Sequence, residues 1–320
     1  MEERIRIAGL GISGLYLYWR LKNDGFDVTG FDIKKEKFYI PCGYATNENI
    51  MQKYMSLINI DFEKYVFSRA NQITFAGNKF DDRILDPSGL CTFDKNKLEE
   101  DGRNSIEISK INRNKGGLII DATGISRSYL GKSPGDSQYF TLEYLTDSSD
   151  HRDFYFYFFE GGRGYFWSFP LGNRYHIGAG SLSKADLDTV RKYIPVRITS
   201  RNIRMSPQFS YIQNGNVIGV GEAIGTVSPI TGEGIVPSLR SAEILYECIK
   251  KYGIEDAGNA YRHRIMDEFG YYYRLSRLVS NIQAGRILNL SNIAAIKYVK
   301  KTVNEFGIRL EILSFIRHFI

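Results

Sequence analysis

Cysteine and histidine are scarce in this sequence, and their scarcity narrows the classes of protein to which it can belong. The 320 residues include three cysteines and four histidines. Cys42, Cys91 and Cys248 cannot all pair with one another and lack metal-ligand spacing, which indicates a reducing compartment rather than a disulfide-stabilised secreted domain. The histidines form no arrangement typical of a metal site or a hydrolytic triad, so we expect no bound metal.

Long hydrophobic runs and blocks of one charge are also absent. No apolar stretch approaches the roughly 18 residues needed to span a bilayer. Met1 to Arg4 lead at once into a predicted strand, so we expect no signal peptide. The net charge of +6 is spread along the chain. It is weakly consistent with binding to anionic ligands or to a lipid surface, and it does not by itself indicate a nucleic-acid partner. We expect a cytoplasmic protein, with peripheral membrane contact left open.

Aromatic residues, by contrast, are plentiful. The chain has 22 tyrosines and 20 phenylalanines, while its hydrophobic content of 43% and charged content of 24% are ordinary for a globular protein. The aromatic excess fits a large apolar substrate, and it fits equally a compositional bias of the genome. The length predicts about two domains.

The chain opens with a short strand that runs into the motif Gly9-x-Gly11-x-x-Gly14. Gly9 permits a tight turn, Gly11 lets the backbone approach a pyrophosphate, and Gly14 lets a helix pack close to the strand. A second strand over 26–32 ends in Asp32, 18 residues after Gly14, where an acid meets a ribose hydroxyl. These features predict a dinucleotide-binding βαβ unit, and by themselves they leave NAD, NADP and FAD open.

A second strand, glycine loop and helix occur late in the chain. A buried strand over 217–221 leads to Glu222, then to the loop Pro229-x-x-Gly232-x-Gly234, and then to a helix predicted from Ile235 to about Lys251. Ligands of open α/β sheets bind outside the carboxyl ends of the strands, so we interpret Glu222 as a ligand contact; a solvated surface charge is the alternative. Arg127, in an earlier loop, is left open between the same two interpretations.

Between these two regions the sequence changes character. Residues 138–181 contain short aromatic strands separated by turn signals, as in a mostly antiparallel sheet. Tyr165, Trp167 and Phe169 alternate along one strand and therefore share one face. That face is either part of the hydrophobic core or a wall of a lipid cavity, where rigid rings suit a long polyene.

Together these patterns predict an α/β protein in which a Rossmann-like nucleotide-binding domain carries an inserted, mostly antiparallel β substrate domain and a helical C-terminus. The nucleotide-binding domain comprises residues 1–65, 92–135 and 205–253. The substrate domain comprises 66–91 and 136–204, and the helical C-terminal region comprises 254–320.

Local patterns predict further elements. Alternation over 66–80 predicts a hairpin with its turn at Gly77–Asn78, and the segment 308–320 is amphipathic, which fits either docking on the core or contact with a membrane. The other predicted elements are helices over 48–58, 94–100, 183–193, 256–279 and 292–320, and strands over 105–111 and 117–121.

The motifs in their order resemble the FAD-dependent geranylgeranyl reductases, including the archaeal digeranylgeranylglycerophospholipid reductases, within the p-hydroxybenzoate-hydroxylase-like flavoprotein superfamily. The resemblance covers residues 4 to about 250. It rests on the segments Gly9-x-Gly11-x-x-Gly14 with Asp32, Ile40-Pro-Cys-Gly-Tyr-Ala45, Asp121-Ala-Thr-Gly-Ile-Ser-Arg-Ser128, Tyr165-x-Trp-x-Phe-Pro170 with Gly178-x-Gly180, and Gly221-Glu222 with Pro229-x-x-Gly-x-Gly-Ile235.

The resemblance implies FAD as cofactor and a set of site residues. Cys42 lies beside the flavin in such proteins and is predicted to shape the pocket or tune proton delivery as the catalytic candidate; a small residue that merely packs there is the alternative. The implied cofactor contacts are Gly9, Gly11, Ser13, Gly14, Asp32, Cys42, Gly43, Ala45, Gly124, Glu222, Gly232, Gly234 and Ile235. The implied substrate contacts are Tyr165, Trp167, Phe169 and Pro170.

The implied activity is reduction of the C=C double bonds of a geranylgeranyl-type prenyl lipid by hydride transfer from reduced flavin. NAD(P)H or a ferredoxin is the implied electron donor. The cofactor carries out the chemistry, and the protein positions the substrate and excludes water. Two alternatives stay open. One is a flavin monooxygenase or halogenase of the same superfamily, and the other is a non-catalytic flavin- or lipid-binding relative.

Overall fold

The buried strands of the nucleotide motif form a parallel sheet, as their continuous apolar sequence predicts. The computed structural model describes residues 4–33, 39–78, 80–104, 106, 117–286 and 290–310. Within them, one five-stranded sheet has the order β14 (Gln213–Asn214), β15 (Val217–Gly219), β8 (Leu118–Asp121), β1 (Ile5–Ala8), β2 (Val28–Phe31). Its pairs are parallel except for β14 with β15. β1, completely buried, lies between β8 and β2, which places the glycine motif that follows it near the middle of the sheet.

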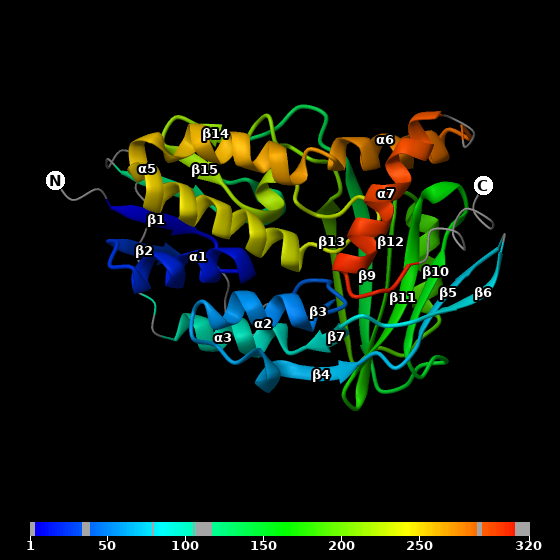
Figure 1. Ribbon diagram of the computed structural model, residues 1–320. Helices are drawn as coiled ribbons and strands as arrows, with labels where there is room; N and C mark the ends of the chain where they lie inside the picture. The colour runs from blue at the N-terminus through cyan, green and yellow to red at the C-terminus, as the bar shows by residue number, and fades with distance from the viewer. Residues whose placement is uncertain are drawn as a thin grey trace.

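Two helices, α1 (Ile12–Asn23) and α5 (Ile235–Phe269), lie side by side in this half of the molecule (Figure 1). Glu243 of α5 joins them, because its carboxylate accepts a hydrogen bond from Tyr16 (2.7 Å) and pairs with Arg20 (2.7 Å). α5 is broken at Gly253, where φ is +77°, a conformation that favours glycine. The helices predicted from Ile235 to about Lys251 and over 256–279 therefore follow one another directly at this break.

The aromatic strands form a second sheet, which confirms the predicted mostly antiparallel region. Its order is β13 (Arg197–Arg204), β9 (Gln138–Thr146), β12 (Arg174–Ser181), β11 (Gly164–Leu171), β10 (Phe154–Phe158), β5 (Ile73–Gly77), β6 (Phe80–Leu85). All neighbours are antiparallel except β10 and β5. The fold class is thus an α/β protein with a nucleotide-type parallel sheet and a large antiparallel one.

The hairpin predicted over 66–80 is wrong in its first strand. β4 (Val66–Arg69) instead joins a small sheet with β7 (Leu90–Phe93) and β3 (Ala45–Asn47). The hairpin is formed by β5 and β6, with Gly77 opposite Phe80. The alternating sequence pattern does not reveal that the strand is interrupted between β4 and β5. At the interruption, the carboxylate of Asp153 accepts hydrogen bonds from the backbone N–H groups of Asn71 and Gln72.

Three further helices have the following bounds: α2 (Glu48–Ser56), α3 (Lys95–Arg103) and α4 (Asp188–Arg191). The capping role predicted around residue 94 is confirmed, because the Asp94 side chain accepts a hydrogen bond from the Lys97 N–H (2.9 Å). The helix predicted over 183–193 is one 3₁₀ turn followed by the short α4. Other 3₁₀ turns span 62–65, 124–126, 160–162 and 221–224.

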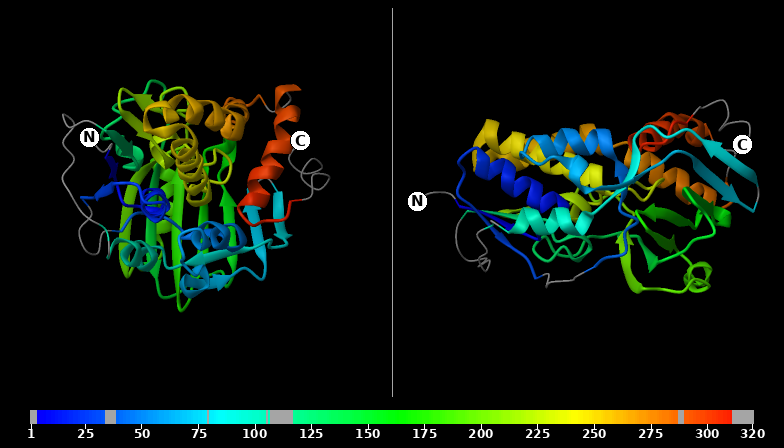
Figure 2. Two further views of the ribbon diagram at one scale, coloured as in Figure 1. Left: turned by 60° about the vertical axis from the view of Figure 1, so that its left-hand side comes forward. Right: turned by 90° about the horizontal axis from the view of Figure 1, so that it is seen from below.

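The C-terminal helices α6 (Tyr272–Gln283) and α7 (Leu290–Glu305) lie over one face of the seven-stranded sheet (Figures 1 and 2). Phe306, just after α7, meets Phe156 of β10 edge to face with ring centroids 6.3 Å apart. The predicted strand over 105–111, apart from Ile106, and the segment 311–320 lie outside the described residues. In the described part of the chain, no helix combines the length and apolar character needed to cross a membrane. The predicted domain boundaries stay predictions.

Candidate functional site

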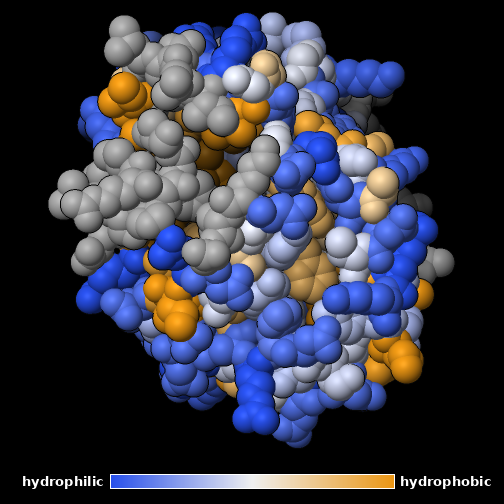
Figure 3. Space-filling model, turned by 90° about the vertical axis from the view of Figure 1, so that its right-hand side faces the viewer, coloured by the Kyte–Doolittle hydropathy of each residue, from blue (hydrophilic) through white to orange (hydrophobic). Residues whose placement is uncertain are grey.

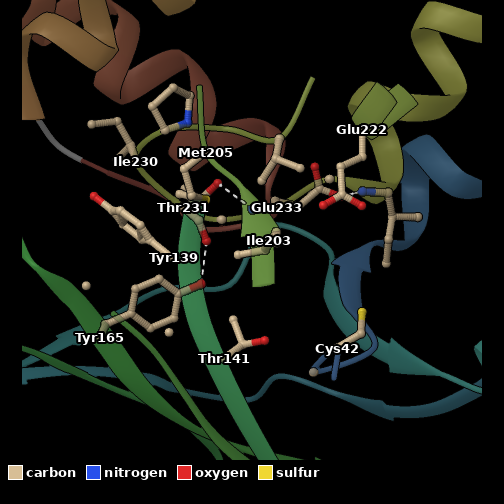
Figure 4. Close-up of a pocket in the computed structure, with 18 of the residues that line it drawn as sticks. Cys42, Tyr139, Thr141, Tyr165, Ile203, Met205, Glu222, Ile230, Thr231 and Glu233 are labelled. Carbon is tan, nitrogen blue, oxygen red and sulfur yellow. Dashed lines mark hydrogen bonds between the residues drawn. The ribbon is translucent and has the colours of Figure 1, made fainter. Parts of the chain in front are cut away.

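A single cavity of about 1860 Å³ extends from the end of β1 to the C-terminal helices (Figure 4). Ligand pockets commonly measure about 300–1,000 Å³, so this cavity has room for a large cofactor together with a second ligand. Its walls come from the β1–α1 turn, the Cys42 segment, α3, the loop 228–234, the seven-stranded sheet, α6 and α7. The two halves of the cavity have different chemistry.

The first half is lined by the glycine motif. Gly9 has φ +90°, and a Cβ there would lie 2.5 Å from the carbonyl oxygen of Ala122. Gly14 does not line the cavity but packs under the turn, because a Cβ on it would lie 1.9 Å from the Gly9 oxygen. Gly11 is the N-cap of α1 and no side chain caps this helix. The first N–H groups of α1 are thus available to an anion, beside Ser13 in the wall.

Asp32, just after β2, lies in the same half of the cavity. Its Oδ2 accepts a hydrogen bond from the Leu10 N–H (2.8 Å), which fixes the carboxylate beside the motif turn. A carboxylate held here can accept from the hydroxyl groups of a ribose. The predicted βαβ arrangement therefore brings the glycines and Asp32 together at one place.

Glu222 is held in the wall by two neighbours from β13. Its Oε2 forms an ion pair with Arg201 Nη2 (2.6 Å), and its Oε1 accepts from the Arg204 N–H (3.1 Å). Gly124 has φ +65° and a Cβ on it would lie 3.0 Å from Glu222 Oε2. Arg201 also lines the cavity. It was not predicted from the sequence, because no pattern in β13 indicates that this arginine pairs with Glu222.

Lys95 and Glu99 form a second buried pair in the wall, with Nζ and Oε1 2.5 Å apart. They stand one helical turn apart on α3, on the side that faces the cavity. Their spacing of four residues is the signal that could have identified the pair. An exposed pair would be the usual interpretation of that spacing, and only the packing of α3 shows that both groups are buried.

Glu233 is a buried carboxyl group in the loop that precedes α5. Its Oε1 accepts from the N–H groups of Ile235 (3.0 Å) and Val236 (2.8 Å). Burial raises the pKa of Glu233 to about 8, against the effect of these two hydrogen bonds. The group therefore holds a proton at neutral pH in the cavity wall. Sequence reasoning selected Gly232 and Gly234 on either side, and these also line the cavity, as does Ile235.

We predict that Glu233→Gln removes a pH-dependent loss of stability. Between the ordinary pKa of 4.5 and the folded pKa of about 8, the folded chain keeps a proton that the unfolded chain releases. Raising the pH through this range therefore lowers the free energy of unfolding of the native protein, by at most about 1.4 kcal/mol per pH unit for one group. Urea unfolding at pH 5 and pH 9 measures the fall, which should be smaller in the variant.

Glu160→Gln is the matched control, since Glu160 is an exposed carboxylate at the same cavity. It should retain the pH-dependent fall of the native protein. Equal falls in the native protein and in Glu233→Gln would show that Glu233 does not hold a proton in the folded chain.

Cys42 lies on the opposite side of the cavity from Tyr165 and Thr231 in Figure 4. Burial raises the pKa of its thiol to about 11, so at neutral pH it is a thiol and not a reactive thiolate. Gly43 and Ala45 line the wall beside it. A Cβ on Gly43 would lie 2.6 Å from the Phe169 ring, so this backbone packs directly on the aromatic strand.

The second half of the cavity is apolar. Tyr165, Trp167 and Phe169 line it while also packing in the hydrophobic core, and a lipid as the occupant of the cavity stays a prediction. The Tyr165 hydroxyl donates to the Thr231 carbonyl (2.5 Å) and so ties the sheet to the loop before α5. The C-terminal helices and the segment after them contribute Leu278, Ile282, Ile293, Ile296, Val299, Val303, Phe306 and Ile308.

Two sequence candidates lie away from the cavity. Pro170 is not in its lining, and its carbonyl accepts a hydrogen bond from Thr92 (2.6 Å). Arg127 is buried, and its guanidinium binds the carbonyl groups of Gly131, Tyr211 and Ala223, which makes it a connector of loops. Among the residues described, no three metal-ligating side chains lie close enough to hold an ion.

Comparisons with known proteins agree with this architecture. No family model matches the chain. An uncharacterized protein of Methanocaldococcus jannaschii is 24% identical, over 90% of this chain and 94% of that one. The structure of a geranylgeranyl bacteriochlorophyll reductase-like protein from Thermoplasma acidophilum superposes with a TM-score of 0.70 at 16% identity, over 95% and 99% of the two chains.

A second solved structure of similar fold is PqsL, a probable FAD-dependent monooxygenase from Pseudomonas aeruginosa. Its TM-score is 0.67 at 14% identity, and the match covers 92% of this chain and 99% of PqsL. At such identities the similarity concerns the fold. The chain therefore has the Rossmann-type α/β fold that these two structures share.

Proposed function

We propose that this chain is an FAD-dependent oxidoreductase that reduces the C=C double bonds of a prenyl lipid. The observation that carries the proposal is the continuity of the cavity, in which a glycine-rich cradle with an acid opens directly into an apolar chamber of aromatic and aliphatic side chains. The fold similarity to flavoproteins supports the cofactor, and the apolar chamber supports the substrate class.

The residues of the first half fit the parts of FAD. The uncapped N-terminus of α1, with Gly11 and Ser13, would receive the pyrophosphate, and Asp32 would accept from the ribose of the ADP part. Glu222 would contact the ribitol, and the Cys42 segment and the loop at Gly232 would border the flavin ring. Reduced FAD supplies a hydride that can be transferred to a carbon of a double bond.

The protein's part in this chemistry is to hold the chain of the substrate, exclude water and keep a proton available. The rings of Tyr165, Trp167 and Phe169 present flat apolar surfaces to a polyene. Burial raises the pKa of Glu233 to about 8, and this residue lies in the same wall, so we propose it as the acid that completes saturation of the bond.

The charges of the cavity indicate how a prenyl lipid would enter. Among the described lining residues, the cations are Lys95 and Arg201, and each is already paired with a glutamate. Among these described residues, a phosphate head group would find no cation beside the apolar chamber that lacks a carboxylate partner. The proposal is therefore that the hydrocarbon chain enters the cavity while an anionic head group stays at its mouth.

Peripheral contact with a membrane is part of the proposal. The exposed sides of α6 and α7 carry Arg274, Arg277, Lys297 and Lys301, and Ile293 at the cavity is 60% exposed. Figure 3 shows apolar side chains gathered around a hollow on the side of the molecule where these helices lie. Basic side chains beside an exposed apolar rim suit a bilayer with anionic lipids. The electron donor we propose is NAD(P)H or a ferredoxin.

Monooxygenation or halogenation is the second candidate activity, and the fold similarity to PqsL favours monooxygenation. The experiment that separates the two is incubation of the FAD-loaded protein with a geranylgeranyl lipid, once without oxygen in the presence of dithionite and once in air with NADPH. Product with added hydrogen in the first reaction supports the reductase. Product with added oxygen in the second supports the monooxygenase, and lipid binding without product in either supports a non-catalytic binder.

A further inference from the structure

Two buried polar side chains, Glu143 and His176, form a cluster behind the Cys42 segment, outside the lining of the cavity. Glu143 of β9 stands opposite Gly178 of β12, which in turn stands opposite Trp167 of β11. A Cβ on Gly178 would lie 2.3 Å from the indole ring, so the missing side chain lets Trp167 lie across the middle strand toward Glu143. His176, two residues before Gly178, lies with its Nδ1 3.8 Å from Glu143 Oε1.

The cluster holds the backbone of the Cys42 segment. The Cys42 N–H donates to Glu143 Oε2 (3.0 Å), and the imidazole of His176 meets the ring of Tyr44 edge to face with centroids 4.5 Å apart. Tyr44 has φ +54°, a left-handed conformation that is costly for a tyrosine and persists only where its surroundings impose it. The segment is therefore constrained by side chains of the sheet behind it.

Burial shifts the pKa of both ionisable groups of this cluster toward the uncharged form. Burial raises the pKa of Glu143 well above its usual range, opposed by the Cys42 N–H and by the charge of Arg197, and burial lowers the pKa of His176 to about 3. The groups that face Glu143 are Arg197 and Thr199 of β13, His176 of β12, Trp167 of β11 and the Cys42 backbone. Both ring nitrogens of His176 lack a hydrogen-bond partner among the described residues.

We propose that Glu143 is a positioning residue, whose carboxyl oxygen fixes the backbone of Cys42 as a rigid part of the cavity wall. Its role is that of a hydrogen-bond acceptor held at a particular distance from the backbone of Cys42. Glutamine has the same length and the same acceptor, and leucine has a similar volume without any acceptor. The inference concerns the wall of the cavity and holds whichever reaction takes place there.

The thiol of Cys42 reports on its own backbone, because Cys42 is partly exposed whereas Cys91 and Cys248 are buried. We would measure the rate at which iodoacetamide alkylates Cys42 in the purified protein, by peptide mass spectrometry, with and without FAD. Glu143→Leu leaves the Cys42 N–H without its acceptor, and we expect alkylation to become roughly tenfold faster, the factor that one lost buried hydrogen bond corresponds to. Glu143→Gln should stay within about twofold of the native rate.

Thr146→Val is the matched control. Thr146 is buried on the same strand and donates to the Ser148 carbonyl (2.9 Å), away from the Cys42 segment. Its loss should lower stability without changing the alkylation rate of Cys42. The visible spectrum of bound FAD is the second readout, which should shift in Glu143→Leu and not in Glu143→Gln or Thr146→Val.

Two results would overturn the inference. A native alkylation rate in Glu143→Leu would show that the carboxyl does not hold the segment. A Glu143→Gln variant that is alkylated as fast as Glu143→Leu would show that an acceptor oxygen at this length is not what holds it. If Glu143→Leu does not fold, Glu143→Asp takes its place, because it withdraws the carboxyl by one methylene and should also accelerate alkylation. These alkylation rates do not depend on the proposed function, so a protein that fails to reduce a prenyl lipid should show the same rates.

Discussion

Gly11→Glu yields a folded protein that no longer binds FAD. Gly11 lies at the uncapped N-terminus of α1, in the wall of the cavity, with φ −80° and ψ −171°, backbone angles that any residue adopts. A glutamate side chain there would fill the place of the pyrophosphate and meet it with a charge of the same sign. We expect FAD affinity to fall by at least about 100-fold, the factor that roughly 3 kcal/mol corresponds to.

The measurement is fluorescence titration with FAD, together with the visible absorption that remains after gel filtration. Asn23→Glu is the control, because it adds the same charge to the same helix at an exposed position at its other end. That variant should bind FAD like the native protein. Retention of yellow colour by Gly11→Glu would place the flavin outside the cradle formed by α1.

Val303→Trp separates the two halves of the cavity. Val303 lines the apolar chamber from α7 and is only 5% exposed, so an indole at this position fills space that the substrate chain would occupy. We expect FAD binding to stay unchanged while turnover of a geranylgeranyl lipid falls by about 100-fold, since misplacing a substrate by about 1 Å can have an effect of this size. The measurement is the rate of lipid saturation by the dithionite-reduced protein.

Ala294→Trp serves as its control, because Ala294 is exposed on the same helix and does not line the cavity. Thermal unfolding of both variants shows whether the larger ring has also strained the core, for which about 1–3 kcal/mol is typical. If Val303→Trp strains the core severely, Val303→Phe is the smaller plug. Native turnover by a stable Val303→Trp protein would mean that the substrate chain does not lie along α7.

The cradle was predictable because its chemistry is local. Gly9, Gly11 and Asp32 are spaced by the geometry of one strand, one turn and one helix, and this spacing is written directly in the sequence. The shared face of Tyr165 and Trp167 follows equally from the alternation of a strand. Each of these residues lies in the lining of the cavity, whereas their contacts with ligands remain predictions.

The remainder of the site depends on packing between segments distant in the sequence. Arg201 meets Glu222 only because β13 passes the loop after β15, and Glu143 reaches Cys42 across 101 residues. The burial of Lys95 is set by the placement of α3, which no local pattern reveals. Likewise, α6 and α7 read as ordinary amphipathic helices, and only their position over the sheet makes them a wall of the cavity.

The mass of a geranylgeranyl lipid after reaction tests the central claim most directly. The FAD-loaded protein, reduced with dithionite and kept free of oxygen, is incubated with the lipid, and the product is analysed by mass spectrometry against Gly11→Glu treated in the same way. The account predicts products heavier by one pair of hydrogen atoms for each bond reduced, made by the native protein and not by the variant. A lipid of unchanged mass, with FAD bound and reduced, would contradict it.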